Sequence, residues 1–189
     1  MKILVYGSTT FGSVVRVLVE ECGHEFAGFI DDVNLSGADV LGGFDAVSRS
    51  HPPETFACVN AVGYKDLAAR RRVTDRIVKA GYETPSLVHP KAIVGRAARV
   101  AAGAMIMAGA IADTRVDLGP GVVMWPGSVV AHDTVIGGNT FLSPNCTICG
   151  CCEVGADCFV GAAAVVVDHA SVPPGTRIKA AERYVTAHR

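Results

Sequence analysis

Apolar residues recur at every sixth position through the C-terminal half of this 189-residue chain. A period of six matches neither an α-helix nor a single strand, but it is typical of a solenoid whose short strands and tight corners form a triangular prism. Three hexapeptides close a coil of eighteen residues, so residues 94–183 are predicted to form five complete coils without an inserted loop. The fifteen rungs of this ladder are Val94, Val100, Ile106, Ala112, Leu118, Met124, Val130, Ile136, Leu142, Ile148, Val154, Val160, Val166, Val172 and Ile178.

A second ladder of mostly small residues follows four positions after each rung and fails only at Glu182. We expect each rung to fill a corner of the prism and each small residue to fit the crowded interior beside it. Five rungs are followed directly by glycine, which tolerates backbone conformations that other residues avoid at corners. These glycines are Gly95, Gly119, Gly137, Gly155 and Gly161.

The first 86 residues have a different pattern, in which strands alternate with helices. Apolar strands are predicted at 2–6, 26–30 and 56–62, and an amphipathic helix at 65–80. This alternation predicts a small parallel sheet covered by helices, that is, a Rossmann-like α/β domain. The expected domains are therefore residues 1–86 and a β-solenoid over residues 87–189.

The bulk properties favour a cytoplasmic protein. A net charge of −1 gives no electrostatic reason to expect nucleic acid or an anionic membrane as a partner. The N-terminus does not resemble a signal peptide, and the most apolar stretch is too short to span a bilayer. We also predict no metal, although cysteines cluster late in the chain, because three of these five lie on the inward ladder of small residues. The cluster comprises Cys146, Cys149, Cys151, Cys152 and Cys158.

A glycine loop follows the first predicted strand. Gly7 and Gly12 match the outer glycines of a dinucleotide fingerprint, but Thr9 occupies the middle position, where the backbone should approach a pyrophosphate. Asp31 lies at a suitable distance along the chain to bind a ribose. Three predicted strands are only half of a full dinucleotide fold, so a nicotinamide cofactor is disfavoured. Two interpretations stay open: a turn that only packs helix against strand, or a loop that holds the nucleotide of a substrate at a helix N-terminus.

Two histidines, His132 and His169, lie at corners of the solenoid frame and should point outward. Asp133, beside His132, can fix the imidazole tautomer and leave the other nitrogen as a general base. Gly150 lies eighteen residues after His132, and its N–H could meet a developing oxyanion one coil away. The alternative for both histidines is a plain surface position, and His169 lies two coils from Asp133.

Together these features resemble a known family. The chain contains Val5-Tyr6-Gly7, a strand end Ile30-Asp31-Asp32, a junction from Leu87 to Ile93, and the solenoid segment Ser128 to Gly137 around His132-Asp133. It is similar to the acetyl-CoA-dependent transferases that acetylate the 4-amino group of nucleotide-linked deoxysugars, the bacillosamine and perosamine type. A branch of sialic acid O-acetyltransferases has the same layout.

The resemblance implies a left-handed parallel β-helix, an exception to the usual right-handed crossover, assembled as a homotrimer with active sites between subunits. It implies that His132 is the general base, that Asp133 orients it, and that the amide of Gly150 receives the thioester oxygen. Acetyl-CoA would lie toward Gly161 and Ala162. The nucleotide and sugar of the acceptor would bind at Gly7, Ser8, Thr9, Gly12, Asp31 and Asp32.

Two other function classes remain open at this point. One is O-acetyl transfer to a sugar or sialic acid hydroxyl, because the same base could deprotonate either nucleophile. The other is a non-catalytic trimeric scaffold, which the glycine-poor run from Lys179 to Arg183 would favour.

Overall fold

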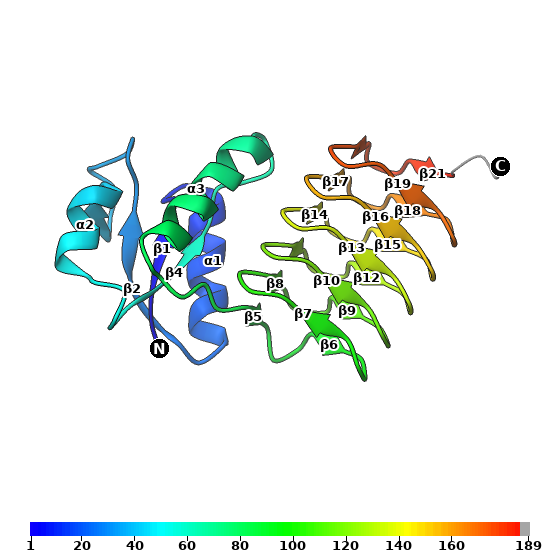
Figure 1. The fold of residues 1–189 in the computed structure, drawn as a ribbon, viewed down its shortest axis with the longest axis horizontal. Helices are drawn as coiled ribbons and strands as arrows, with labels where there is room; N and C mark the ends of the chain where they lie inside the picture. The colour runs from blue at the N-terminus through cyan, green and yellow to red at the C-terminus, as the bar shows by residue number, and fades with distance from the viewer. Residues whose placement is uncertain (186–189) are drawn as a thin grey trace. The chain divides into compact units, whose positions relative to one another are not determined.

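The computed structural model describes residues 1–185 and divides the chain after Pro85 into two compact units (Figure 1). The first unit, from Met1, is an α/β domain, and the second, from Ser86, is a β-solenoid. Among the described residues, no helix combines the length and the apolar character needed to cross a membrane.

The N-terminal unit is a four-stranded parallel sheet with the strand order β3-β2-β1-β4. This is the order of the first four strands of a Rossmann fold. The strands are β1 (Lys2–Tyr6), β2 (Glu25–Ile30), β3 (Val40–Gly42) and β4 (Ala57–Asn60), and the helices are α1 (Thr10–Glu21), α2 (Phe44–Ser50) and α3 (Leu67–Lys79).

Strand β3 and helix α2 were not predicted from the sequence, and the last strand is shorter than predicted. Because β3 has three residues, it offers too little alternation to be recognised from its pattern. Strand β4 ends at Asn60, whose side chain binds the polypeptide that follows. Its amide donates to the carbonyl of Arg70 at 2.7 Å, and its oxygen accepts from the N–H of Val62 at 2.8 Å. Asn60 thereby turns the chain out of the sheet.

The C-terminal unit is a left-handed parallel β-helix built from two-residue strands. Sheet B comprises β5 (Leu87–Val88), β8 (Met105–Ile106), β11 (Val123–Met124), β14 (Phe141–Leu142), β17 (Phe159–Val160) and β20 (Arg177–Ile178). Sheet C comprises β6 (Ile93–Val94), β9 (Ile111–Ala112), β12 (Val129–Val130), β15 (Thr147–Ile148), β18 (Val165–Val166) and β21 (Arg183–Tyr184). Sheet D comprises β7 (Arg99–Val100), β10 (Asp117–Leu118), β13 (Val135–Ile136), β16 (Glu153–Val154) and β19 (Ser171–Val172).

The six-residue ladder is confirmed as the core of the solenoid. Every rung from Ile106 to Ile178 is at most 2% exposed, and paired strands are offset by eighteen residues, as in Val129 against Thr147. The frame extends one strand beyond the predicted rungs at each end, to Val88 and Tyr184.

Polar members of the small-residue ladder are buried without loss of hydrogen bonding. The hydroxyl of Thr134 donates to the carbonyl of Cys149 at 3.0 Å, and that of Thr140 donates to the carbonyl of Gly155 at 2.9 Å. Both side chains are fully buried. A threonine can therefore replace an alanine inside this prism, because the corner of the next coil supplies an acceptor.

The glycines that follow the rungs serve a purpose different from the predicted one. Gly137 does not have a positive φ; instead, a Cβ added there would lie 2.4 Å from the backbone nitrogen of Ala156 in the next coil. The left-handed conformation occurs two positions later in each hexapeptide, from Ala97 to Ala181. Glycine, asparagine and aspartate, the residues that accept this conformation most readily, fill many of these corners.

We therefore expect Gly137→Ala to destabilise the solenoid, because backbone on the next coil leaves no room for a methyl group. Overpacking of this kind costs about 1–3 kcal/mol, measurable as a lower midpoint in denaturant unfolding followed by circular dichroism. Gly63→Ala is the control, since its Cβ would meet nothing within 4 Å. Equal midpoints for the two variants would contradict the assignment.

Candidate active site

His132 and Asp133 form a hydrogen-bonded pair at the corner that follows β12. The Nδ1 atom of His132 lies 2.9 Å from Oδ2 of Asp133, and both side chains are exposed. Asp133 has the left-handed backbone conformation of its corner, with φ 58°. The neighbouring carboxylate orients the imidazole and leaves Nε2 available for a proton.

Arg115 completes this cluster and was not predicted from the sequence. Its guanidinium binds the carboxylate of Asp133 in a bidentate pair, with Nε to Oδ1 at 2.6 Å and Nη2 to Oδ2 at 2.7 Å. The hydrogen bonds from Arg115, followed by that from His132, hold the pKa of Asp133 well below its usual range. The eighteen-residue spacing between Arg115 and Asp133 was the signal that could have revealed this contact.

Gly150 lies directly against the imidazole of His132, as the eighteen-residue frame predicts. A Cβ added at Gly150 would lie 2.8 Å from Cε1 and 2.9 Å from Nε2 of the histidine. Only a glycine therefore leaves space for the ring in its present position. Within the described residues, the N–H of Gly150 donates no hydrogen bond, so this donor is available beside the base.

The glycine loop and Asp31 form a second cluster in the N-terminal unit. One carboxylate oxygen of Asp31 accepts from the N–H and hydroxyl of Ser8, at 3.0 and 2.7 Å, and the other accepts from the N–H groups of Val33 and Asn34, both at 2.9 Å. Burial alone would raise the pKa of Asp31, but these hydrogen bonds outweigh it and lower the pKa. Asp31 therefore fixes the conformation of the loop.

Gly7 and Gly12 allow the loop to close on the sheet and helix. Gly7 has a φ of 115°, and a Cβ at Gly12 would lie 2.0 Å from the carbonyl oxygen of Gly7. Thr9 is the N-cap of α1, and its side chain makes no capping hydrogen bond. The first turn of α1 also contains no acidic residue, which favours an anion at this helix N-terminus.

Asp32 belongs to a different cluster from Asp31. Its carboxylate accepts from the Tyr6 hydroxyl, from the N–H of Phe44 at 2.8 Å and from Arg76 at 2.7 Å. Burial opposes ionisation, but these partners lower the pKa of Asp32, and burial together with Asp32 raises the pKa of Tyr6. Consecutive residues at a strand end point to opposite sides, so the structure does not bring Asp32 to Ser8 and Asp31.

Comparisons with known proteins find a match for each unit. The PglD N-terminal domain model matches residues 2–77, and the bacterial transferase hexapeptide model of six repeats matches residues 133–168. The acetyltransferase domain of PglB from Neisseria gonorrhoeae is 26% identical, with a TM-score of 0.88, over 97% of this chain and 91% of that chain. The chain therefore combines a PglD N-terminal domain with transferase hexapeptide repeats, and it is an acyltransferase.

Two further solved structures resemble this acetyltransferase. The same PglB domain in complex with acetyl coenzyme A is 26% identical, with a TM-score of 0.85, over 95% of this chain and 88% of that chain. A variant of perosamine N-acetyltransferase from Caulobacter crescentus, in complex with CoA and GDP-perosamine, shares the fold at 21% identity and a TM-score of 0.80. That match covers 96% of this chain and 94% of that chain. No curated protein sequence matches the chain significantly.

Gly161 and Ala162 lie on another edge of the acetyltransferase solenoid. They follow β17 in sheet B, whereas His132 and Gly150 follow β12 and β15 in sheet C. A single chain therefore does not bring the two sets together. His169 occupies the same column as Asp133, two coils further on, with a left-handed φ of 59°.

The late cysteines do not gather into one metal-binding cluster. Cys146, Cys152 and Cys158 point into the prism, where burial raises the pKa of Cys146 to about 12. All seven cysteines are free thiols, and Cys151 is exposed. Among residues 1–185, the potential metal ligands that do lie close together are instead His132, Asp133 and Cys151, with one ligand atom of each within 4.8 Å of the others.

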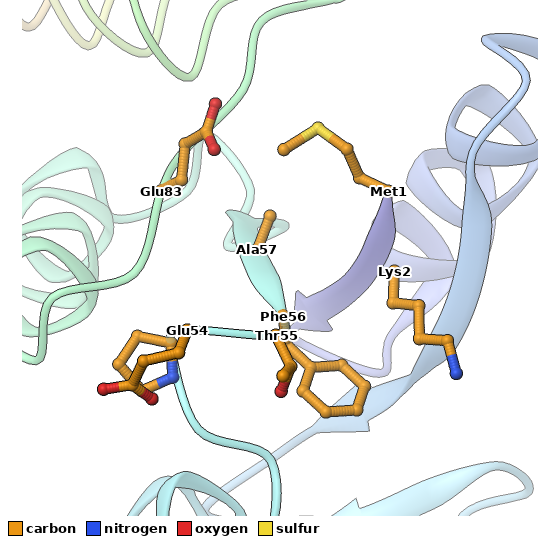
Figure 2. A pocket seen from close by; sticks show the side chains of 8 residues that line it. Met1, Lys2, Glu54, Thr55, Phe56, Ala57 and Glu83 are labelled. Atoms are coloured by element: carbon orange, nitrogen blue, oxygen red, sulfur yellow. The ribbon is translucent and has the colours of Figure 1, made fainter.

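A hollow in the N-terminal unit lies at the amino ends of β1 and β4, lined by Met1, Lys2, Phe56 and Ala57 among others. Figure 2 shows that the charged ends of Lys2, Glu54 and Glu83 are spread around it rather than directed at one point. Its volume of about 180 Å³ is below the ~300–1,000 Å³ of typical ligand pockets. Open parallel sheets bind ligands at the carboxyl ends of their strands, so this hollow does not compete with the glycine loop.

Replacing Arg115 with alanine should raise the pKa of Asp133, because the bidentate cation that stabilises the carboxylate is lost. The carboxylate would then take up its proton at a higher pH than in the parent protein. Carbon-13 NMR titration of the Asp133 carboxyl measures this change. Arg99→Ala is the matched control, since Arg99 pairs with Asp117 at 2.6 Å across the same eighteen-residue step. An unchanged titration of Asp133 in Arg115→Ala would refute the role of Arg115.

Proposed function

We propose that the protein is an acetyl-CoA-dependent N-acetyltransferase acting on the 4-amino group of a nucleotide-linked deoxy-amino sugar. The observation that supports this most is the cluster of His132, Asp133 and the available N–H of Gly150 within one corner of the solenoid. The relatives add support, since their names include acetyl coenzyme A and GDP-perosamine as bound molecules.

In the proposed reaction, Nε2 of His132 accepts a proton from the sugar amine as the amine attacks the thioester carbonyl. Asp133 holds the imidazole through Nδ1 and stabilises its charged form, and Arg115 positions Asp133. The N–H of Gly150 donates to the oxyanion of the tetrahedral intermediate. The carbon–sulfur bond then breaks, the amide forms, and the imidazolium returns its proton to the sulfur of coenzyme A.

The donor site needs a second subunit in this proposal. Gly150 would bind the thioester, while Gly161 and Ala162 lie on a different edge of the same chain. A homotrimer with acetyl-CoA between neighbouring subunits would place Gly161 and Ala162 of one chain beside Gly150 of another. Sheet C offers a surface for this contact, because its outward residues are largely apolar: Ile93, Ile111, Val129 and Val165.

The acceptor would bind at the glycine loop, with its diphosphate at the start of α1. Gly7, Ser8, Thr9 and Gly12 form the loop, and Asp31 already accepts four hydrogen bonds from this region. We therefore propose that the main role of Asp31 is to hold the loop in its conformation. Asp32 would contribute to acceptor binding only indirectly, through its hydrogen-bond partners Tyr6 and Arg76.

O-acetyl transfer is the second candidate, because the His132 base can deprotonate a hydroxyl as well as an amine.

We place the reaction in the cytoplasm, since seven free thiols suit a reducing compartment.

The test is thiol release from acetyl-CoA with a panel of nucleotide-linked 4-amino sugars and matching 4-hydroxy sugars. We expect turnover with an amino sugar, and His132→Asn should lower it by about 10²–10⁴-fold because the base is lost. His169→Asn is the control, a histidine at a similar exposed corner. Turnover with hydroxy sugars alone would favour the second candidate, and an unaffected His132→Asn variant would exclude this residue as the base.

The trimer can be tested separately by light scattering. Val129→Lys places a charge on the outer face of sheet C and should dissociate the assembly, since an unpaired charge in an apolar interface is costly. Val135→Lys is the control and should leave the trimer intact. It makes the same change on sheet D, whose other outward residues are polar: Arg99, Asp117, Glu153 and Ser171. A trimer that persists in Val129→Lys would rule out sheet C as the interface.

A further inference from the structure

The corner that holds the proposed base also contains an exposed thiol. Cys151 lies one coil above Asp133, eighteen residues further along the chain, at a left-handed corner with φ 57°. One ligand atom each from Cys151, His132 and Asp133 lie within 4.8 Å of one another. The acetyl transfer proposed above gives no role to this thiol.

We propose that His132, Asp133 and Cys151 form a binding site for Zn²⁺ that inhibits the enzyme by occupying the catalytic imidazole. Thiolate, imidazole and carboxylate are the three protein ligands that zinc prefers, and a three-ligand site leaves the fourth position to water. This mixed set separates the site from a cluster of surface carboxylates, which would favour magnesium or calcium instead.

The geometry requires only a small adjustment. Ligand atoms bound about 2.0–2.3 Å from a tetrahedral zinc are about 3.5 Å apart. Atoms at the 4.8 Å limit would therefore approach by about 1 Å, whereas Nδ1 of His132 and Oδ2 of Asp133, which lie 2.9 Å apart, would separate if both bound the metal. Exposed side chains can make this change by rotating. The carboxylate of Asp133 still has a lone pair with which to bind a metal. Of its roughly four lone-pair positions, three accept hydrogen bonds, two from Arg115 and one from His132.

The binding step exchanges protons for metal. Cys151 loses its thiol proton to solvent as sulfur binds Zn²⁺, and the imidazole nitrogen that binds the metal must be unprotonated. A metal-bound imidazole cannot accept a proton from the acceptor amine. Zn²⁺ should therefore slow acetyl transfer, and a chelator should restore it. This part of the inference rests on the proposed role of His132 as the base.

The first measurement is metal binding without turnover. Titration of the metal-free full chain with Co²⁺, a coloured substitute for Zn²⁺, should produce a thiolate-to-cobalt charge-transfer absorption that Zn²⁺ abolishes. Cys151→Asn should lose this band while keeping the turn, because Asn139 and Asn145 occupy equivalent left-handed corners. Cys22→Ser, in the N-terminal unit, should keep the band. No band in the parent protein, or one that persists in Cys151→Asn, would overturn the site.

The second measurement compares inhibition, each variant being referred to its own metal-free rate. We expect Zn²⁺ to inhibit the parent and Cys22→Ser equally. Cys151→Asn should need at least about tenfold more metal for the same inhibition, because losing even a residue that only supports a ligand costs about 10–100-fold in metal affinity. Metal binding that leaves acetyl transfer unchanged would overturn the inhibitory role. Failure to acetylate any acceptor would count against the proposed function alone, because the cobalt band reports on the site independently.

Discussion

The hydrogen bond from each coil to the next is the interaction on which the solenoid and its candidate site depend. The N–H of Val129 donates to the carbonyl of Cys146 at 2.9 Å, and that of Ala131 donates to the carbonyl of Ile148 at the same distance. Repeated along three sheets, these bonds fix neighbouring coils about 4.8 Å apart. Residues eighteen apart thereby become neighbours, whatever their side chains. Asp133 lies next to Arg115 in the coil before it and next to Cys151 in the coil after it for this reason.

The same constraint explains how much of the solenoid could be predicted from the sequence. A period of six leaves one frame that buries all the rungs from Ile106 to Ile178, so both the core and the contact of Gly150 with His132 follow from counting. Arg115 was missed because the column of Asp133 was followed only forward to His169 and not back by one coil. The role of Gly137 was misjudged because a free φ and a lack of space for Cβ favour the same residue. Only the three-dimensional structure shows which of these two reasons applies at Gly137.

The N-terminal unit was less predictable because its decisive contacts join distant segments. Asp31 and Asp32 are adjacent in the sequence and were predicted to share one role in acceptor binding, but a strand directs consecutive side chains to opposite sides. Asp31 binds the loop after β1, whereas Asp32 binds Arg76 from α3 and the start of α2. No local pattern indicates that Arg76, 44 residues away, neutralises Asp32. The three-residue strand β3 likewise exists through its pairing with β2.

The position of the His132–Asp133 pair at a corner has a physical reason. Inward positions are filled by the apolar core, and outward strand positions lie on flat sheet surfaces. A corner residue in the left-handed conformation has neither restriction, and aspartate is among the residues that tolerate it. Asp133 therefore occupies its corner at little conformational cost, and the coil before it supplies Arg115 at the equivalent corner. The fold thus forms a charged, oriented pair on its surface without introducing polar groups into its core.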